Sequence, residues 1–178
     1  MELTTATHLI EGGVDKQLGT QTWGELGAGN GLFTKALASL LDPKSEIYAI
    51  DKDLASLRQI PDELNQVTIK KSTKDFSKEE ITEDPFDGIL MANSLHYVQN
   101  QSALLIQLSH LLKPNGRMIL IEYDMDKANP WVPYPISYSN MIKLANSGGF
   151  ESVTRLGETP SAYNRANIYS VVFKKGVQ

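Results

Sequence analysis

Hydrophobic and polar positions along the chain follow two periods, one typical of buried strands and the other of helices that cover a sheet. Short apolar runs alternate with stretches of helical period, the order expected of a βαβ architecture with a parallel sheet. The predicted strands are residues 21–26, 46–51, 67–70, 86–92, 117–123, 150–156 and 168–174. The first of these is weakened by Gly24 and is predicted mainly from its position.

The helical stretches have clear starts and ends. Residues 32–41 place apolar side chains on one face, and Asp42-Pro43 ends that helix. Asp53 is a predicted N-cap of a short helix that carries Leu54 and Leu57. Further helices are expected over residues 101–112 and around 139–146.

The last two predicted strands are joined by residues 157–167, which contain Gly157 and Pro160. A parallel crossover needs about a dozen residues or more and usually contains a helix. An antiparallel hairpin is therefore expected at the C-terminus, which places one reversed strand in an otherwise parallel sheet.

A glycine-rich loop follows the first predicted strand. Its sequence ELGAGNG, residues 25–31, has glycine at positions 27, 29 and 31. The glycines can serve a tight turn with positive φ, or a dinucleotide site, although the third glycine of the GxGxxG pattern is replaced by Leu32. The third interpretation is a different cofactor that lies against the bare backbone.

Two carboxylates near this loop favour the third interpretation. Glu25 would repel a pyrophosphate but attract an ammonium or sulfonium group. Asp51 lies twenty residues after Gly31, close to the ~20 expected of an acid that accepts hydrogen bonds from ribose hydroxyls. Alone, Asp51 is more simply a strand-end carboxylate or a helix cap, but this spacing favours a nucleoside that carries a positive group.

Five segments in order resemble the class I S-adenosylmethionine-dependent methyltransferases. They extend over nearly the whole chain, from about Thr22 to Lys174, and are ELGAGNG (25–31), IYAIDKD (47–53), STKDF (72–76), FDGILMANSLHYV (86–98) and LLKPNGRMILIEY (111–123). The resemblance implies an α/β fold, a Rossmann-like three-layer sandwich with a seven-stranded, mostly parallel sheet that ends in a C-terminal antiparallel hairpin. It also implies S-adenosylmethionine as the cofactor.

The resemblance assigns roles to particular residues. The methionine part of the cofactor would lie on the loop formed by Glu25, Gly27, Ala28, Gly29, Asn30 and Gly31. Asp51 would hold the ribose hydroxyls, and Lys52 would flank the adenosine. Asp75 and Phe76 would contact the amino group and ring of adenine, and Asn93 would line the pocket beside the sulfonium. Gly24 departs from the family, which usually has an apolar or bulky residue there.

His96 is the predicted catalytic base, because it follows the fourth predicted strand at the edge where open α/β sheets bind ligands. The alternative is a hydrogen-bonded loop histidine that helps to pack the cofactor. The segment NSLHY, residues 93–97, differs from the Asn or Asp followed by two prolines and an aromatic residue that is typical of enzymes methylating amide or nucleobase nitrogens. Methylation of DNA amino groups or of glutamine is therefore disfavoured.

Two further segments are candidates for the acceptor side. The loop NPWVPYP, residues 129–135, carries Trp131 and Tyr134 and precedes Tyr138; it is either a roof over the acceptor or a stiff connector. Tyr123 and Asp124 are secondary candidates for orienting the acceptor. Residues 1–21 are a predicted N-terminal lid or cap.

Composition limits the class of protein. A length of 178 residues, 41% of them hydrophobic and 21% charged, predicts one globular domain over 1–178. A net charge of −4 disfavours nucleic acid as a partner. The absence of cysteine excludes disulfides and thiolate chemistry, and three histidines without ligand spacing predict no metal site.

No stretch approaches the ~18 apolar residues that span a bilayer, so no membrane partner and a cytoplasmic location are expected. The expected acceptor is a small molecule, and the oligomeric state is left open. Two other functions remain: a non-catalytic S-adenosylmethionine-binding module, and an oxidoreductase that uses a nucleotide cofactor, which Glu25, Leu32 and the terminal hairpin disfavour.

Overall fold

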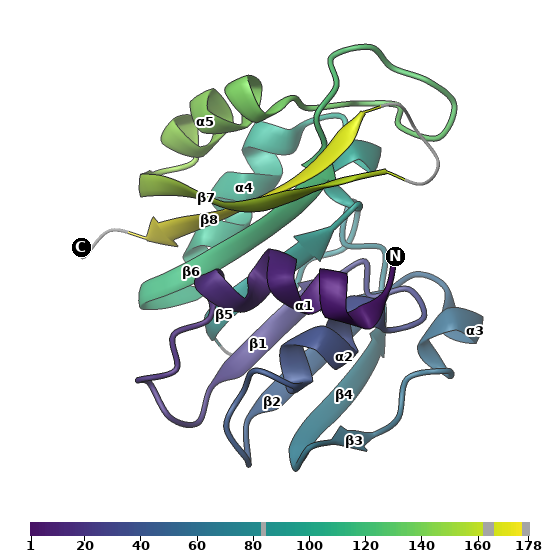
Figure 1. The fold of residues 1–178 in the computed structure, drawn as a ribbon, viewed down its shortest axis with the longest axis vertical. Helices are drawn as coiled ribbons and strands as arrows, with labels where there is room; N and C mark the ends of the chain where they lie inside the picture. The colour runs from purple at the N-terminus through teal and green to yellow at the C-terminus, as the bar shows by residue number, and fades with distance from the viewer. Residues whose placement is uncertain (83–84, 162–165, 176–178) are drawn as a thin grey trace.

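One sheet organises the computed structural model, which describes residues 1–82, 85–161 and 166–175. Within these residues the sheet has eight strands in the order β3-β4-β2-β1-β5-β6-β8-β7 (Figure 1). Their bounds are β1 Thr22–Leu26, β2 Glu46–Asp51, β3 Glu63–Leu64, β4 Val67–Thr73, β5 Phe86–Ala92, β6 Leu112–Tyr123, β7 Phe150–Pro160 and β8 Asn167–Lys175.

The predicted mixture of parallel and antiparallel pairing is confirmed. The pairs β1·β2, β1·β5, β2·β4 and β5·β6 are parallel, and β8 runs antiparallel to both β6 and β7. The eighth strand, β3, has two residues and pairs antiparallel with β4 at the sheet edge. The sequence analysis missed it because two residues are too few to show a period.

β6 begins earlier than predicted. Residues 113–116 were expected to form only the stop of the preceding helix, but the strand starts at Leu112. Its register against β5 shifts between the pairs Phe86↔Leu112 and Gly88↔Arg117, so an irregular segment is included in the strand. The polar, turn-like composition of this segment conceals the backbone pairing.

Helices cover both faces of the sheet and make three layers (Figure 1). They are α1 Leu3–Ile10, α2 Leu32–Ala38, α3 Leu54–Leu57, α4 Gln101–His110 and α5 Tyr138–Ser147, with 3-10 turns at Glu11–Gly13 and Leu95–Tyr97. α1 and α2 bury their apolar side chains on one face, and α4 and α5 on the other. The predicted Asp53 cap of α3 is confirmed, because its side chain accepts a hydrogen bond from the Ala55 N–H.

β6 shows how one apolar strand serves both layers. Ile119 and Ile121 belong to the core under α1 and α2, whereas Met118 and Leu120 belong to the core under α4 and α5. All four are fully buried. A parallel sheet covered on both faces requires such a continuous apolar run, which is why this strand is evident in the sequence.

β1 and β5 each place a large aromatic ring against a glycine of the other strand. Trp23 is fully buried and lies against Gly88 of β5, its register partner. A Cβ atom at Gly88 would lie 2.4 Å from the Trp23 ring, and one at Gly24 would lie 3.0 Å from the ring of Phe86. Gly24, which departs from the family pattern, is therefore explained by the volume of Phe86.

The strand order also fixes where a ligand site can form. β1 lies between β2 and β5. From β2 the chain continues to β3 and β4 on one side of β1, and from β5 it continues to β6 on the other side. In open α/β sheets, ligands bind outside the carboxyl ends of the strands at such a switch point. The glycine loop follows β1, Asp51 is the last residue of β2, and Asn93 follows β5.

We expect Gly88→Ala to lower the free energy of unfolding by about 1–3 kcal/mol, because the new methyl group would overlap the buried Trp23 ring. Urea denaturation provides the measurement. Gly157→Ala is the matched control, since a Cβ atom there would make only an ordinary contact, 3.7 Å from Leu9. An equal loss in both variants would contradict the packing argument.

Candidate active site

The glycine loop is shaped mainly by the protein's own side chains. Gly27 and Gly31 have φ values of 84° and 85°, a region that side chains rarely adopt. A Cβ atom at Gly27 would lie 2.5 Å from Cβ of Ser94, and one at Gly31 would lie 2.7 Å from Cγ1 of Ile60. Gly29 differs, because a Cβ atom there would meet nothing within 4 Å. The tight-turn interpretation therefore accounts for Gly27 and Gly31, and Gly29 is the loop glycine at which a side chain would find open space.

Asp51 makes hydrogen bonds within the protein and also lines a cavity. Its Oδ2 accepts a hydrogen bond from the Gly29 N–H at 2.8 Å, and its Oδ1 accepts one from the Asp53 N–H at 2.9 Å. The carboxylate thus holds the loop in place, and it also lines a cavity. Each oxygen keeps further acceptor capacity for a ligand hydroxyl.

Glu25 lies beneath the loop and is only 1% exposed. Thr34 of α2 donates its hydroxyl hydrogen to Oε2 at 2.5 Å. Burial raises the pKa of the Glu25 carboxyl to about 8, and the neighbouring charge of Asp51 adds to the rise. A buried carboxyl with a raised pKa gains its charge readily only when a cation approaches.

A cavity of about 600 Å³ lies beside the loop. Its lining includes Gly27, Asp51, Lys52, Asp75, Phe76 and Asn93. The Asp75 carboxylate accepts hydrogen bonds from the Ser77 hydroxyl and N–H, and pairs with Lys78 at 3.1 Å. The hydrogen bond from Ser77 lowers the pKa of Asp75, so this group is an anion at neutral pH.

Asn93 stands where several cavities meet. It lines the 600 Å³ cavity, a second one of about 460 Å³ and a third of about 270 Å³. Its φ of 51° is in the left-handed region, and its N–H donates to the Ile121 carbonyl at 2.8 Å. Its side-chain Oδ1 is buried without a hydrogen-bond partner. A buried acceptor without a partner is costly, and a ligand donor would satisfy it.

The 460 Å³ cavity, which Asn93 also lines, has aromatic walls. Its lining includes His96, Tyr97, Tyr123, Asn129 and Trp131. The Trp131 side chain is 79% exposed, so this wall is apolar and open to solvent.

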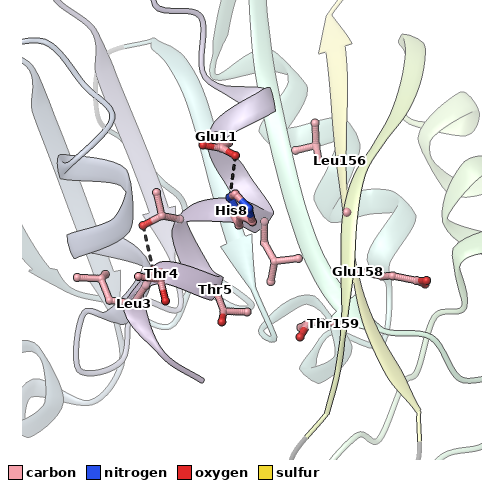
Figure 2. Close-up of a pocket in the computed structure, with 11 residues that line it drawn as sticks. Leu3, Thr4, Thr5, His8, Glu11, Leu156, Glu158 and Thr159 are labelled. Carbon is pink, nitrogen blue, oxygen red and sulfur yellow. Dashed lines mark hydrogen bonds and ion pairs between the residues drawn. The ribbon is translucent and has the colours of Figure 1, made fainter.

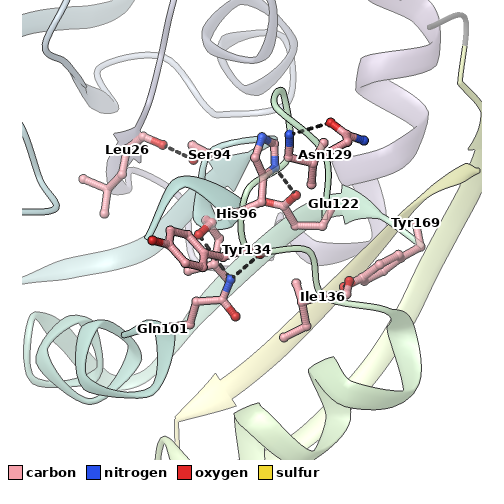
Figure 3. A network of polar contacts seen from close by, with 11 residues as sticks. Leu26, Ser94, His96, Gln101, Glu122, Asn129, Tyr134, Ile136 and Tyr169 are labelled. Atoms are coloured by element: carbon pink, nitrogen blue, oxygen red, sulfur yellow. Dashed lines mark hydrogen bonds and ion pairs between the residues drawn. The ribbon is translucent and has the colours of Figure 1, made fainter. Parts of the chain in front are cut away.

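His96, which lines this cavity, forms a buried pair with Glu122 (Figure 3). Their side chains are 2% and 1% exposed, and Nδ1 of His96 lies 2.6 Å from Oε2 of Glu122. The ring also packs against Tyr97 and Tyr123, at centroid distances of 4.4 and 5.9 Å. The sequence analysis missed Glu122; its one available signal was a carboxylate inside the most apolar strand.

The loop after β6 is hydrogen-bonded to the backbone of His96. The Tyr134 N–H donates to the His96 carbonyl at 3.0 Å, and the Asn129 side chain accepts from the Trp131 and Val132 N–H groups, each at 2.9 Å. Of the three aromatic residues predicted for a roof, only Trp131 lines the 460 Å³ cavity. Tyr134 lines a neighbouring groove, and Tyr138 packs on Tyr169 with a centroid distance of 5.6 Å.

The two secondary candidates for orienting the acceptor, Tyr123 and Asp124, have different surroundings. Tyr123 lines the 460 Å³ cavity. Asp124 accepts a hydrogen bond from the Tyr138 N–H at 2.9 Å, so it holds the start of α5.

A family model described as a methyltransferase domain matches residues 25–118, from the end of β1 into β6. The chain belongs to this family. With its fold and the order of its motifs, it is a class I S-adenosylmethionine-dependent methyltransferase. S-adenosylmethionine is accordingly the cofactor expected for it. A search of curated proteins found no significant match.

Solved structures share the fold of this methyltransferase at low sequence identity. An S-adenosylmethionine-dependent methyltransferase from Methanosarcina mazei has a TM-score of 0.71 and 14% identity, over 95% of this chain and 97% of the other. Human N-acetylserotonin methyltransferase in complex with S-adenosylmethionine has a TM-score of 0.69 and 20% identity, over 98% and 52%. The [4+2]-cyclase SpnF has a TM-score of 0.75 and 13% identity, over 99% and 82%.

The predicted site residues of the methyltransferase fall into two groups. Those that line the cavities are Gly27, Asp51, Lys52, Asp75, Phe76, Asn93 and His96. The other predicted cofactor residues lie in or under the loop: Glu25 and Ala28 are buried, Asn30 is exposed, Gly31 packs on Ile60, and Gly29 faces open space. The residues of the second group determine the shape and the electrostatics of the loop more than they form the surface of the cavities.

The structure also bears on metal binding and on membrane-spanning helices. Among residues 1–82, 85–161 and 166–175, no group of three or more His, Asp or Glu side chains is arranged to hold a metal ion. None of the helices in these ranges has the length and apolar character needed to cross a bilayer.

Glu25 gives the ligand-free methyltransferase a pH-dependent stability. Its pKa in the folded state, about 8, is above the ordinary 4.5, so the folded protein binds this proton more tightly than the unfolded chain does. The resulting stability is complete below about pH 4.5 and is lost progressively as the pH rises to about 8. At pH 7 the loss is about 3 kcal/mol.

We therefore expect Glu25→Gln to be more stable than the wild type near pH 8 and to differ little near pH 5. Urea denaturation of the ligand-free protein at the two pH values measures the change. The exposed Glu158, which pairs with Arg155, provides the control variant Glu158→Gln, whose difference from the wild type should not depend on pH. A pH-independent effect of Glu25→Gln would contradict the raised pKa.

Proposed function

We propose that this protein transfers the methyl group of S-adenosylmethionine to a small-molecule acceptor, and that the transfer takes place beside Asn93. The observation that carries the proposal is the buried Oδ1 of Asn93, which has no partner and stands at the junction of the 600 and 460 Å³ cavities. Cofactor and acceptor would each occupy one cavity and meet at this residue.

The 600 Å³ cavity fits the cofactor in size and chemistry. When bound, S-adenosylmethionine supplies a methyl carbon activated by a positively charged sulfur. Asp51 would accept hydrogen bonds from the ribose hydroxyls, with Lys52 beside the adenosine. Phe76 would pack on the adenine ring, and Asp75 would accept from its amino group.

The loop would hold the charged end of the cofactor. Gly29 offers an open backbone surface there. The Glu25 carboxyl beneath the loop would ionise and attract the cation through the loop, since opposite charges favour the ionised form of a buried acid. Asn93 would accept a hydrogen bond from the cofactor or acceptor with its free Oδ1.

The 460 Å³ cavity is the proposed acceptor site, with His96 as the base. In-line displacement at an activated methyl group needs alignment above all, and a base where the acceptor loses a proton. Within the described residues the His96 ring makes its hydrogen bond through Nδ1, and no hydrogen bond engages Nε2. The aromatic walls suit a small, partly apolar acceptor.

We further propose that the whole chain, residues 1–178, works as a single methyltransferase domain, with its first 21 residues as a cap on the acceptor side. Ala6, Leu9 and Ile10 bury α1 against the sheet. Met1 and Thr5 line the 270 Å³ cavity together with Asn93 and Tyr123. Figure 2 shows the groove between α1 and β7, which shares Thr5 and Thr159 with that cavity.

We expect Asp51→Ala to weaken S-adenosylmethionine binding by about 1.5–3 kcal/mol for each hydrogen bond to the carboxylate that is lost. Calorimetric titration measures the affinity. Asp53→Asn is the matched control: this exposed carboxylate lies two residues away, caps α3 and should leave the affinity unchanged. Equal affinity in Asp51→Ala and the wild type would contradict the placement of the ribose.

We expect His96→Ala to retain cofactor binding but to form S-adenosylhomocysteine roughly 10²-fold more slowly with an acceptor that must lose a proton. The measurement pairs calorimetry with a product assay over phenols, carboxylates, amines and thiols. His110→Ala, at the exposed end of α4, is the control. Loss of cofactor binding in His96→Ala would instead make His96 part of the cofactor wall, and wild-type binding without turnover of any acceptor would favour a binding module.

A further inference from the structure

Both carboxylate oxygens of Glu122 are committed to one residue. Oε2 lies 2.6 Å from Nδ1 of His96, and Oε1 accepts the His96 backbone N–H at 3.2 Å. Glu122 comes from β6 and His96 from the 3-10 turn after β5, so the pair joins the ends of neighbouring strands. This double contact fixes both the position of the backbone and the orientation of the ring (Figure 3).

The pair also determines where the imidazole proton resides. An ionised carboxylate only accepts hydrogen bonds, so Nδ1 of His96 must carry the proton that points at Oε2. In the neutral ring the other nitrogen, Nε2, then has a free lone pair. His96 lines the 460 Å³ cavity, so a base at Nε2 would act on an acceptor bound there.

The structure assigns Glu122 as the positioning residue that makes Nε2 of His96 a base, and points to an aromatic hydroxyl compound, a phenol, as the acceptor class. This inference rests on the proposed function and specifies its acceptor. It depends on two independent features, the buried carboxylate–imidazole pair and the aromatic walls of the cavity.

The chemistry of the cavity favours a hydroxyl over a carboxylate or a thiol. A carboxylate acceptor has no proton to lose and would approach the buried charge of Glu122, and the described lining includes no lysine or arginine to offset that repulsion. A thiol has a pKa of about 8.5, below the pKa of about 10 of a phenol, and so depends less on a base. A neutral phenol has both a proton for Nε2 and a flat ring for Tyr97, Tyr123 and Trp131.

The phenolic oxygen forms a bond to the methyl carbon, while the bond from that carbon to sulfur breaks and its electron pair neutralises the sulfonium, which leaves S-adenosylhomocysteine. The phenolic proton moves to Nε2 of His96. The resulting imidazolium is stabilised by the Glu122 carboxylate until the proton passes to solvent.

A coloured phenol tests the acceptor class directly. Wild-type protein loaded with S-adenosylhomocysteine is titrated with 4-nitrophenol at a pH below the pKa of the free phenol, and the visible absorption of the phenolate is followed. We expect the phenolate absorption to appear when 4-nitrophenol binds. Its amplitude is expected to be about tenfold lower in Glu122→Gln. Asp124→Asn, a change of the carboxylate two residues away that holds α5, is expected to behave like the wild type.

The histidine tautomer provides a second test, in which the wild type alone can contradict the inference. The chain has three histidines, of which His8 and His110 are exposed, so the ¹⁵N resonances of His96 can be assigned by elimination. We expect Nδ1 of His96 to be protonated and Nε2 bare in the wild type, and this preference to be lost in Glu122→Gln. A proton on Nε2 in the wild type would overturn the role of Glu122.

The outcomes separate this inference from the proposed function. Wild-type protein that binds S-adenosylhomocysteine by calorimetry but produces no phenolate overturns the phenol class alone. An equal phenolate response in the wild type and Glu122→Gln overturns the positioning role. Failure of the wild type to bind S-adenosylmethionine or S-adenosylhomocysteine overturns the proposed function itself.

Discussion

The contact between Ser94 and the end of β1 holds the two halves of the site together. The Ser94 hydroxyl donates to the Leu26 carbonyl at 2.7 Å, and its Cβ occupies the space that a side chain at residue 27 would need. Only glycine at that position, with φ of 84°, allows the approach. As a result Asn93, the residue before Ser94, stands at the edge of the glycine loop, and His96 follows it in the lining of the 460 Å³ cavity.

Three carboxylates then set the electrostatics around this contact. Glu25 is buried with Thr34 as its hydrogen-bond donor, Asp51 holds the loop and faces the cavity, and Glu122 is buried against His96. Negative charge in a poorly solvated place is unfavourable unless a positive group approaches. The arrangement therefore suits a site in which a cationic ligand is bound on one side and a transient imidazolium is formed on the other.

Most of the fold was predictable because its signals are local. β2 and β5 have the predicted bounds, and the hairpin of β7 and β8 follows from the short linker between them. The two-residue β3 and the early start of β6 were not predictable, since backbone pairing there is imposed by the neighbouring strands rather than by a periodic pattern. Likewise Gly24 is a weak strand residue by composition and is explained only by the ring of Phe86.

The sequence by itself determined the fold class, the family and the segments that form the site, because strand periods, the glycine loop and the spacing to Asp51 are written along the chain. Only the tertiary structure decided what each residue in those segments contacts. It directed Gly27 toward Ser94 and Gly31 toward Ile60, and paired His96 with Glu122 across 26 positions of the chain. The reason is that such contacts depend on how neighbouring strands are aligned and spaced, which no single stretch of residues encodes.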